Sequence, residues 1–485
     1  DAGVDPYPRR YDTDHSLADI RDGYGALDAG SETDARVSVA GRIMLLRRQG
    51  KLVFANLRDR TGDLQLFVSK AVIGDDGFDA VTELDLGDVV GVEGTVMVTR
   101  KGELSIKVER CTLLAKAVRP FPDKWKGLTD VDARFRQRYV DLVVNEDTRR
   151  AFVVRHRAVA AIRAHLDGQG FIEVETPILS LVQGGATARP FVTHYNALGI
   201  DTYLRIAIEL HLKRLIVGGM ERVFEMGRIF RNEGIDTRHN PEFTMLEAYQ
   251  AYTDYEGMMT LTEGIVEAAA RAALDGGTTV TLGDRVIDLA PPWRRVRMVD
   301  LIEEVTGEHL EPAMPLAAAR AAAARLGLEV EDHWGSGRIT HHVYDDLCER
   351  TVVQPTIVYD HPTEVSPLAK ARADDPTVVE RFEVIVDGRE LANAYSELND
   401  PVDQLHRFQS EAAAKAEGDA EAGDVDLDYI RALEYGMPPT GGLGIGIDRL
   451  AMLLAGVESI REVVLFPTLR PETGLSLDEF PYARR

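Results

Sequence analysis

Two neighbouring strands are predicted by the runs Phe224-Glu225-Met226-Gly227-Arg228-Ile229-Phe230-Arg231-Asn232-Glu233-Gly234 and Arg238-His239-Asn240-Pro241-Glu242-Phe243. The first strand is expected over 223–231 and the second over 243–251. Alternation along the second strand places five side chains on one face of a sheet: Phe243, Met245, Glu247, Tyr249 and Ala251. An unpaired buried carboxylate is costly, so Glu247 on this face predicts a ligand-binding surface rather than a purely apolar core.

Common nucleotide-binding motifs are absent from the sequence. It has no G-x-x-x-x-G-K-[ST] loop and no H-E-x-x-H helix, and the glycines at 441–446 lack the spacing of a dinucleotide-binding fold. These absences argue against P-loop kinases and NAD-dependent enzymes. Arg231 ends a predicted strand and Arg449 opens an apolar helix. Both suit a polyphosphate, because a guanidinium can hold an oxyanion through two hydrogen bonds.

The N-terminal part of the chain has the pattern of a small β-barrel. About five short strands are predicted between Val37 and Leu114, the number found in an OB-type Greek-key barrel. From Arg36 to Lys70, eight Lys or Arg residues stand against two acidic residues, a local balance of +6. Phe54 and Gln65 are expected on the outer face among these charges, where an aromatic ring can stack on a single-stranded base.

Composition and spacing predict an α+β protein with a barrel and a larger domain. The run Arg119-Pro120-Phe121-Pro122 predicts a linker, because closely spaced prolines favour an extended path. Ala-rich helical segments interrupt the later strand pattern, as an insertion would. The expected divisions are an N-terminal extension (1–35), a barrel (36–118), a linker (119–135) and a larger domain (136–485) with a helical insertion at about 256–380.

Charge and composition exclude several classes of protein. A formal charge of −24 argues against a protein that coats nucleic acid along its whole surface. Two cysteines cannot build a four-cysteine metal site, and no apolar run reaches the roughly 20 residues of a membrane helix. We therefore expect a cytoplasmic protein with no membrane contact from this chain. Because the sequence begins with Asp1, a longer parent protein stays an open alternative.

The motifs resemble those of the class II aminoacyl-tRNA synthetases. The run 224–247 is similar to motif two of that family, 442–449 to motif three, and 170–177 to motif one, whose proline lies at the family's dimer interface. Three further runs resemble the lysine-specific members: Gly184-Gly185-Ala186-Thr187-Ala188-Arg189-Pro190-Phe191, Tyr395-Ser396-Glu397-Leu398-Asn399-Asp400 and Leu433-Glu434-Tyr435-Gly436-Met437-Pro438-Pro439-Thr440. The resemblance extends from about Val37 to Pro471. It implies an OB-fold anticodon-binding domain, an antiparallel-sheet catalytic domain, a homodimer, and L-lysine, ATP and tRNA(Lys) as partners.

The resemblance also implies roles for individual residues. Catalysis would depend on Arg231 at the α-phosphate and the amino-acid carboxylate, Arg449 at the γ-phosphate and His239 at the outer phosphates. Glu233 would read the adenine, on which Phe243 would stack. The implied lysine ligands are Glu247, Tyr249 and Glu397 for the ε-ammonium, Glu209 and the Gly185 carbonyl for the α-amino group, and Asn393 for the carboxylate. The implied anticodon readers are Phe54, Gln65 and Glu109. We expect the substrate ammonium to be the cation that neutralises Glu247 and Glu397.

Carboxylate spacing predicts a Mg²⁺ site. If Asp387-Gly388 forms a two-residue hairpin turn, Glu390 opposes Ile385 and lies diagonal to Glu383, about 7–8 Å apart between backbones. Two carboxylates at that separation can share a hard cation with the phosphates of ATP.

The same strand requires an irregularity. Strict alternation would turn Asn393 and Glu397 away from the face that carries Glu390. A β-bulge is therefore predicted near Leu391 to Ala392, because one extra residue restores all three side chains to one face.

Three alternatives stay open. A synthetase for aspartate or asparagine would share the barrel and the motifs, although Glu247 and Glu397 would oppose an acidic substrate. A bifunctional protein that produces lysylphosphatidylglycerol would use the same lysine chemistry beside a membrane domain. A nucleic-acid-binding paralogue without catalysis would not need Arg231 or Arg449. The sequence also departs from the family at Ile208, where proline is usual.

Overall fold

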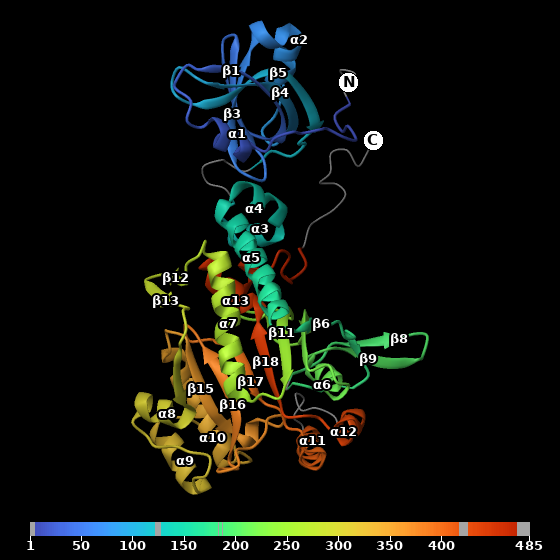
Figure 1. The fold of residues 1–485 in the computed structure, drawn as a ribbon, viewed down its shortest axis with the longest axis vertical. Coiled ribbons are helices and arrows are strands. Elements are labelled where there is room, and N and C mark those ends of the chain that lie inside the picture. Colours follow the sequence, from blue (N-terminus) through green and yellow to red (C-terminus); the bar gives the residue numbers. More distant parts are fainter. Residues whose placement is uncertain (1–4, 122–127, 183, 187, 417–424, 473–485) are drawn as a thin grey trace. The chain divides into compact units, whose positions relative to one another are not determined.

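The computed structural model describes residues 5–121, 128–182, 184–186, 188–416 and 425–472. The chain divides into two compact units, Asp1–Asn145 and Glu146–Arg485 (Figure 1). The predicted linker lies within the first unit, and its residues 122–127 fall outside the described residues.

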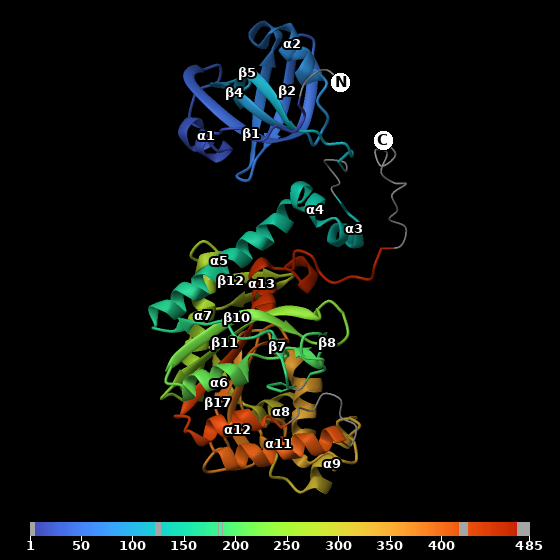
Figure 2. The same ribbon diagram turned by 90° about the vertical axis from the view of Figure 1, so that its right-hand side faces the viewer.

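The first unit contains a closed five-stranded barrel, as the sequence predicts (Figure 2). Its strands follow the order β1-β2-β3-β5-β4. They are β1 (Glu32–Gln49), β2 (Leu52–Arg58), β3 (Asp63–Ser69), β4 (Val89–Val98) and β5 (Leu104–Ala115), with helix α2 (Lys70–Thr82) between β3 and β4. Alternate residues of β2 and β3 point into the barrel and are buried, so the remaining positions of this hairpin face outward.

Residues before the barrel also belong to its core. Helix α1 (Leu17–Tyr24) begins after Ser16, whose side chain forms a capping box with Asp19. Its residues Leu17 and Ile20 are fully buried in the apolar cluster of the barrel. The predicted extension 1–35 is therefore not separate from the barrel, and the cause is long-range packing that local sequence patterns do not reveal. Two short helices, α3 (Val131–Arg136) and α4 (Arg138–Val144), complete the unit.

The second unit is built on an eight-stranded sheet in the order β14-β15-β16-β17-β18-β11-β10-β6. Pairing is antiparallel except for β14 with β15 and β10 with β6. The strands are β6 (Ile172–Glu173), β10 (Arg222–Phe230), β11 (Glu242–Ala251), β14 (Arg294–Arg297), β15 (Thr356–Pro362), β16 (Val378–Ile385), β17 (Glu390–Ser396) and β18 (Thr440–Gly446). Two smaller sheets join β12 (Thr279–Leu282) to β13 (Arg285–Asp288), and β7 (Leu179–Ser180) and β8 (Val192–Tyr195) to β9 (Ile200–Leu204).

Helices cover both faces of this sheet (Figures 1 and 2). On one face lie α5 (Glu146–Gly168), α7 (Tyr255–Ala273) and α13 (Ile447–Ala455), packed on buried residues such as Leu246, Ala248 and Ile445. On the other lie α6 (Glu209–Val217), α11 (Pro401–Ala416) and α12 (Leu427–Glu434). Tyr249 is buried on this second side, in a cluster with Phe408 of α11. The face that carries Tyr249 is the one on which the sequence predicts a binding surface.

The predicted helical insertion at 256–380 is wrong in part. It contains β14, β15 and the start of β16, all strands of the main sheet. The segment outside the sheet runs between β14 and β15 and holds α8 (Met298–Thr306), α9 (Leu316–Arg325), α10 (Ser336–Val343), a π-helical turn, η1 (Tyr344–Cys348), and a 3-10 turn, η2 (Glu349–Thr351). Arg294–Arg297 is too short and too basic to carry a strand signature, so pairing with Thr356–Tyr359 decides its conformation.

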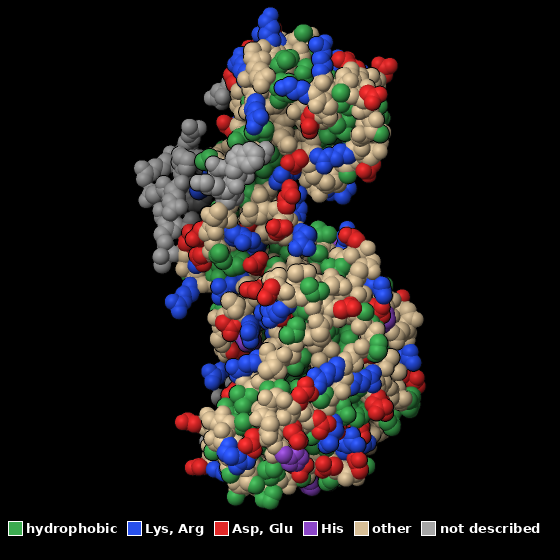
Figure 3. All heavy atoms as spheres, turned by 90° about the vertical axis from the view of Figure 1, so that its left-hand side faces the viewer, with side chains coloured by type: hydrophobic (Ala, Val, Ile, Leu, Met, Phe, Trp, Pro, Cys, Tyr) green, Lys and Arg blue, Asp and Glu red, His purple; other side chains and the backbone are tan. Residues whose placement is uncertain are grey.

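Charged side chains of both signs are mixed on the face that Figure 3 shows. Among the described residues, no helix combines the length and the apolar character needed to cross a membrane.

Candidate active site

The hairpin between β16 and β17 has the geometry that the sequence predicts. Asp387 and Gly388 have φ values of 56° and 66°, as a type I′ turn requires, and Val386 and Arg389 exchange backbone hydrogen bonds of 2.9 and 3.2 Å. Ile385 pairs with Glu390 whereas Val384 pairs with Ala392, so Leu391 is an extra residue. The predicted β-bulge is confirmed.

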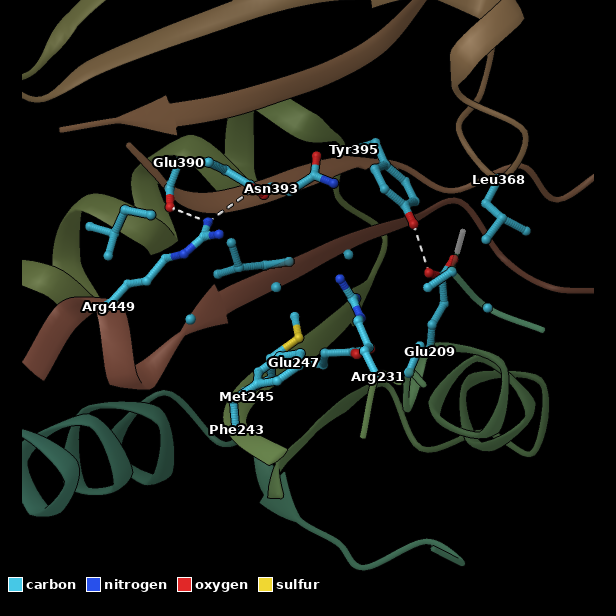
Figure 4. A pocket seen from close by; sticks show the side chains of 18 of the residues that line it. Glu209, Arg231, Phe243, Met245, Glu247, Leu368, Glu390, Asn393, Tyr395 and Arg449 are labelled. Carbon is cyan, nitrogen blue, oxygen red and sulfur yellow. Dashed lines mark hydrogen bonds and ion pairs between the residues drawn. The ribbon is translucent and has the colours of Figure 1, made fainter. Parts of the chain in front are cut away.

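The bulge brings three side chains of β17 to one cavity. Glu390, Asn393 and Tyr395 line a cavity of about 410 Å³, whereas Ala392 and Ala394 lie in the core on the opposite face. The same cavity is lined by Phe243, Met245, Glu247 and Tyr249 of β11, as alternation predicts (Figure 4). It also contains Gly185, Glu209, Arg231, Glu233, His239 and Arg449. Of the thirteen residues predicted to bind ATP or lysine or to hold Mg²⁺, eleven line this cavity, and the two that do not are Glu383 and Glu397.

Arg231, directly after β10, and Arg449, in α13, both line the cavity (Figure 4). The guanidinium of Arg231 lies over the ring of Phe243, 5.3 Å from its centroid, and its Nε is buried with no hydrogen-bond partner among the described residues. Burial lowers the pKa of Arg231, although the group stays charged. Arg449 donates from Nη1 to the Glu390 carbonyl at 2.7 Å and to its carboxylate at 3.1 Å. Glu233, Glu390 and Glu247 partly balance the charge of Arg231, and its Nε is available to donate to a ligand.

The loop between β10 and β11 supplies His239 and Glu233. The His239 ring lies 2.9 Å from the Asp236 carboxylate through Nδ1, and its side chain is about half exposed. Asp236 also accepts the backbone N–H groups of Arg238 and His239, at 2.6 and 2.7 Å. These hydrogen bonds fix a loop that carries polar groups along one side of the cavity.

Glu247 is a buried carboxylate with two hydrogen-bond donors. It accepts the backbone N–H of Ile208 at 3.1 Å and the Tyr249 hydroxyl at 3.1 Å. Burial, together with the nearby charge of Glu209, raises the pKa of Glu247 to about 7. The departure at Ile208 has a structural consequence here, because a proline at this position would have no N–H to donate.

Lys213 is the main residue that sequence reasoning missed. It is fully buried, its Nζ lies 2.5 Å from Glu209 Oε1, and it also forms an ion pair with Glu397. The expectation that the substrate ammonium neutralises the pair is therefore wrong for Glu397, because the chain supplies one ammonium itself. The spacing of Glu209 and Lys213, four residues apart, is typical of an ion pair on a helix and was an available signal.

Glu397 lies behind the cavity wall rather than in it. The wall at this point is Gly442, which lines the cavity, and a Cβ on that glycine would overlap the Glu397 carboxylate and crowd the Tyr249 ring. Burial strongly raises the pKa of Glu397, against the opposing effect of Lys213. Glycine at 442 is thus required for the carboxylate to approach the cavity.

Glu209 stands at the start of α6. Just before it, the buried guanidinium of Arg205 donates to the carbonyls of Thr176 and Arg228 and to Glu225. The second carboxylate oxygen of Glu209 accepts the Tyr395 hydroxyl at 2.8 Å. Gly185 lines the cavity nearby with a φ of 86°, which a residue with a side chain would rarely adopt.

Arg381 connects the amino-acid end of the cavity to the predicted metal site. It donates from Nε to Asn393 Oδ1 at 3.0 Å and from Nη2 to Glu383 Oε1 at 2.7 Å. Glu383 is buried, and that burial, with the like charge of Glu390, raises its pKa to about 7 against the effect of Arg381. A cation beside these two carboxylates would relieve their repulsion, and their oxygen atoms suit a hard ion.

The predicted anticodon residues lie on the outside of the barrel. Phe54 is partly exposed on β2, and its ring packs edge-on against Phe67 with centroids 5.5 Å apart. Gln65 donates to the Ser105 hydroxyl at 2.8 Å, and Glu109 forms an ion pair with Arg36. The outward orientation of Phe54 and Gln65 is as the alternation predicts.

Comparison with known proteins matches each unit to a protein family. The family model described as tRNA synthetases class II (D, K and N) matches residues 130–470, and the OB-fold nucleic acid binding domain matches residues 37–114. A lysine–tRNA ligase of Enterococcus faecalis is 51% identical over 96% of this chain and 94% of its own length. A lysine–tRNA ligase of Moorella thermoacetica is 52% identical over 97% and 95%, and one of Staphylococcus aureus is 49% identical over 97% and 96%. The chain therefore belongs to the class II tRNA synthetases of the D, K and N group.

Proposed function

We propose that the chain is a lysine–tRNA ligase, which activates L-lysine with ATP and transfers it to tRNA(Lys). The observation that carries this proposal is the buried Glu247 near Arg231, in a cavity that also holds Glu209. An acidic pocket next to a phosphate-binding arginine suits a cationic amino acid. Aspartate or asparagine would instead need a basic or amide group opposite the side chain, so this pocket disfavours both. The lipid-lysylating alternative would use the same activation chemistry.

The reaction has two steps. A carboxylate oxygen of lysine attacks the α-phosphorus of ATP, and pyrophosphate leaves with the electrons of the broken P–O bond. The terminal ribose hydroxyl of the tRNA then attacks the lysyl carbonyl, loses its proton and releases AMP. Alignment and charge neutralisation accelerate both steps, with no protein nucleophile.

Each cavity residue takes the role that its position supports. Arg231 neutralises the α-phosphate and orients the lysine carboxylate, which Asn393 also holds. Arg449 and His239 neutralise the outer phosphates. Glu233 and Phe243 hold the adenine. Glu209 and the Gly185 carbonyl bind the α-amino group, Glu247 and Tyr249 contact the ε-ammonium, and Glu397 acts on it from behind Gly442.

Glu383 and Glu390 would hold Mg²⁺. When bound, this ion would neutralise part of the charge of the ATP phosphates. Glu390 also fixes Arg449, so the same carboxylate would position the cation and the guanidinium.

The barrel would bind the anticodon through Phe54, Gln65 and Glu109. A homodimer is supported by large apolar side chains that are exposed within 172–200. They are Ile172, Ile178, Leu179, Leu181, Val192, Leu198 and Ile200. Light scattering would test the dimer, and a Leu179→Asp variant should shift it toward monomer. A cytoplasmic location stays a prediction.

The decisive experiment is amino-acid-dependent pyrophosphate exchange, measured separately with each of the twenty amino acids. Lysine should support exchange far better than any other. Stronger exchange with aspartate or asparagine would replace the proposal with one of those specificities, and no exchange with any amino acid would favour the paralogue without catalysis.

A further inference from the structure

A second cavity, of about 420 Å³, adjoins the first and shares His239, Glu390 and Arg449 with it. Three possible metal ligands gather beside it: His341 of α10 and Glu383 of β16, which line the cavity, and His361 of β15, which lies behind them. One ligand atom from each lies within 4.8 Å of the other two. His361 is fully buried, Glu383 is 8% exposed, and His341 is partly buried.

The hydrogen bonds of both histidines fix which nitrogen is free. The Nε2 of His361 lies 3.2 Å from the Val358 carbonyl, which can only accept, so this nitrogen carries the proton. The Nδ1 of His341 lies 3.0 Å from the Asp345 carboxylate, which also accepts. The remaining nitrogens, His361 Nδ1 and His341 Nε2, are therefore the lone-pair atoms of the two rings.

Both of these nitrogens are buried and have no hydrogen-bond partner among the described residues. Two lone pairs cannot bond to each other, and an unsatisfied buried acceptor is costly. The rings lie 5.9 Å apart between centroids, which leaves room for an atom between them. A cation that accepts both lone pairs would satisfy the two histidines at once.

Charges around the cluster favour a cation. The acidic side chains near it are Asp345, Glu349, Glu383, Asp387 and Glu390, and the basic ones are Arg238, Arg381, Arg389 and Arg449. Five carboxylates thus stand against four guanidinium groups.

We propose that His341, His361 and Glu383 bind one divalent transition-metal ion of the Zn²⁺ class, at a site that shares Glu383 with the Mg²⁺ site proposed beside ATP. Two imidazole nitrogens and a carboxylate oxygen suit Zn²⁺ or Co²⁺ and leave one position for water. The Asp345 carboxylate and the Val358 carbonyl orient the two rings, as outer partners of metal-bound histidines do. The site does not depend on which amino acid the enzyme activates.

Co²⁺ binding to the full, untagged chain tests the proposal. The titration is followed by visible absorption without ATP and without Mg²⁺, so that Glu383 is available to Co²⁺. We expect one Co²⁺ per chain with the intense absorption of a four-coordinate site. His341→Asn and His361→Asn should each weaken Co²⁺ binding by about 100-fold or more.

His342→Asn is the matched control. His342 is the next residue on α10, but its ring packs against Trp334, 4.9 Å between centroids, and it is outside the cluster. This variant should bind Co²⁺ as the wild type does. Zn²⁺ should also raise the melting temperature of the wild type and of His342→Asn, but not of His341→Asn.

Three results would overturn the proposal: no saturable Co²⁺ binding by the wild type, binding unchanged in His341→Asn, or cobalt–thiolate absorption that assigns the ion to Cys348. Because His341 is partly exposed, its variant is expected to fold even if His361→Asn does not. Pyrophosphate exchange with lysine is measured separately and does not decide this question.

Discussion

Lys213 and Glu397 form an ion pair in which both side chains are fully buried. Against the effect of burial, the carboxylates of Glu209 and Glu397 raise the pKa of Lys213, so it stays charged. Among the described residues, no lysine or arginine forms an ion pair with Glu247. The ammonium of a bound lysine is thereby directed toward Glu247, whose hydrogen bonds come only from neutral groups.

Replacing Glu247 by Gln should lower kcat/KM for lysine by about 10²- to 10³-fold, because breaking a buried charge pair costs about 3–5 kcal/mol. The KM for ATP should barely change. Pyrophosphate exchange at varied lysine concentration measures the effect. A change within about threefold, under ~1 kcal/mol, would remove Glu247 from the lysine site.

Lysine binding should weaken as the pH falls through about 7. The pKa of Glu247 is raised to about 7, and only its ionised form can pair with an ammonium. Affinity should therefore fall about tenfold per pH unit below that value and level off above it. Calorimetry in two buffers of different ionisation enthalpy should detect proton release on binding near pH 7. Ile208→Pro, which removes one hydrogen bond to the carboxylate, should move the midpoint upward.

Lys213→Met should reduce the free energy of unfolding by about 3–5 kcal/mol, because it leaves Glu209 and Glu397 buried without their cation. Urea denaturation measures the loss. Adding Glu397→Gln to this variant should restore part of the stability, since one uncompensated charge is then gone. If the single variant loses less than ~1 kcal/mol, the ion pair is not needed for the fold.

Phe243→Ala should affect ATP more than lysine. Its ring shares the cavity with Glu247 and supports the Arg231 guanidinium. Loss of a stacked base costs about 1–3 kcal/mol, so the KM for ATP should rise accordingly. An increase confined to the KM for lysine would contradict the adenine role.

Phe54→Ala should weaken binding of tRNA(Lys) by about 1–3 kcal/mol and leave pyrophosphate exchange unchanged. Val72→Ala, at an exposed apolar position of the same unit, is the control and should change neither. An unaltered KM for tRNA would show that Phe54 serves to pack Phe67 instead.

Local patterns were sufficient for the parts of the fold that depend on neighbours in sequence. Alternation predicted the cavity face of β11, and counting residues from the Asp387-Gly388 turn predicted the bulge. The position of Lys213 against Glu397 could not be predicted, because it depends on packing between a helix and a strand far apart in the sequence. The same holds for His341 and His361, which meet only when α10 packs on the sheet.

The extra residue at Leu391 decides which side chains of β17 face the cavity and which face the core. Deleting it would return Asn393 and Tyr395 to the core face and turn Ala392 and Ala394 toward the cavity, although every other amino acid would be unchanged. A substitution at 391 changes one side chain. The loss of its codon would instead exchange the cavity-facing side chains of β17 with the core-facing ones. In descendants of this gene, we therefore expect point changes to accumulate between 383 and 397 while insertions and deletions there are eliminated.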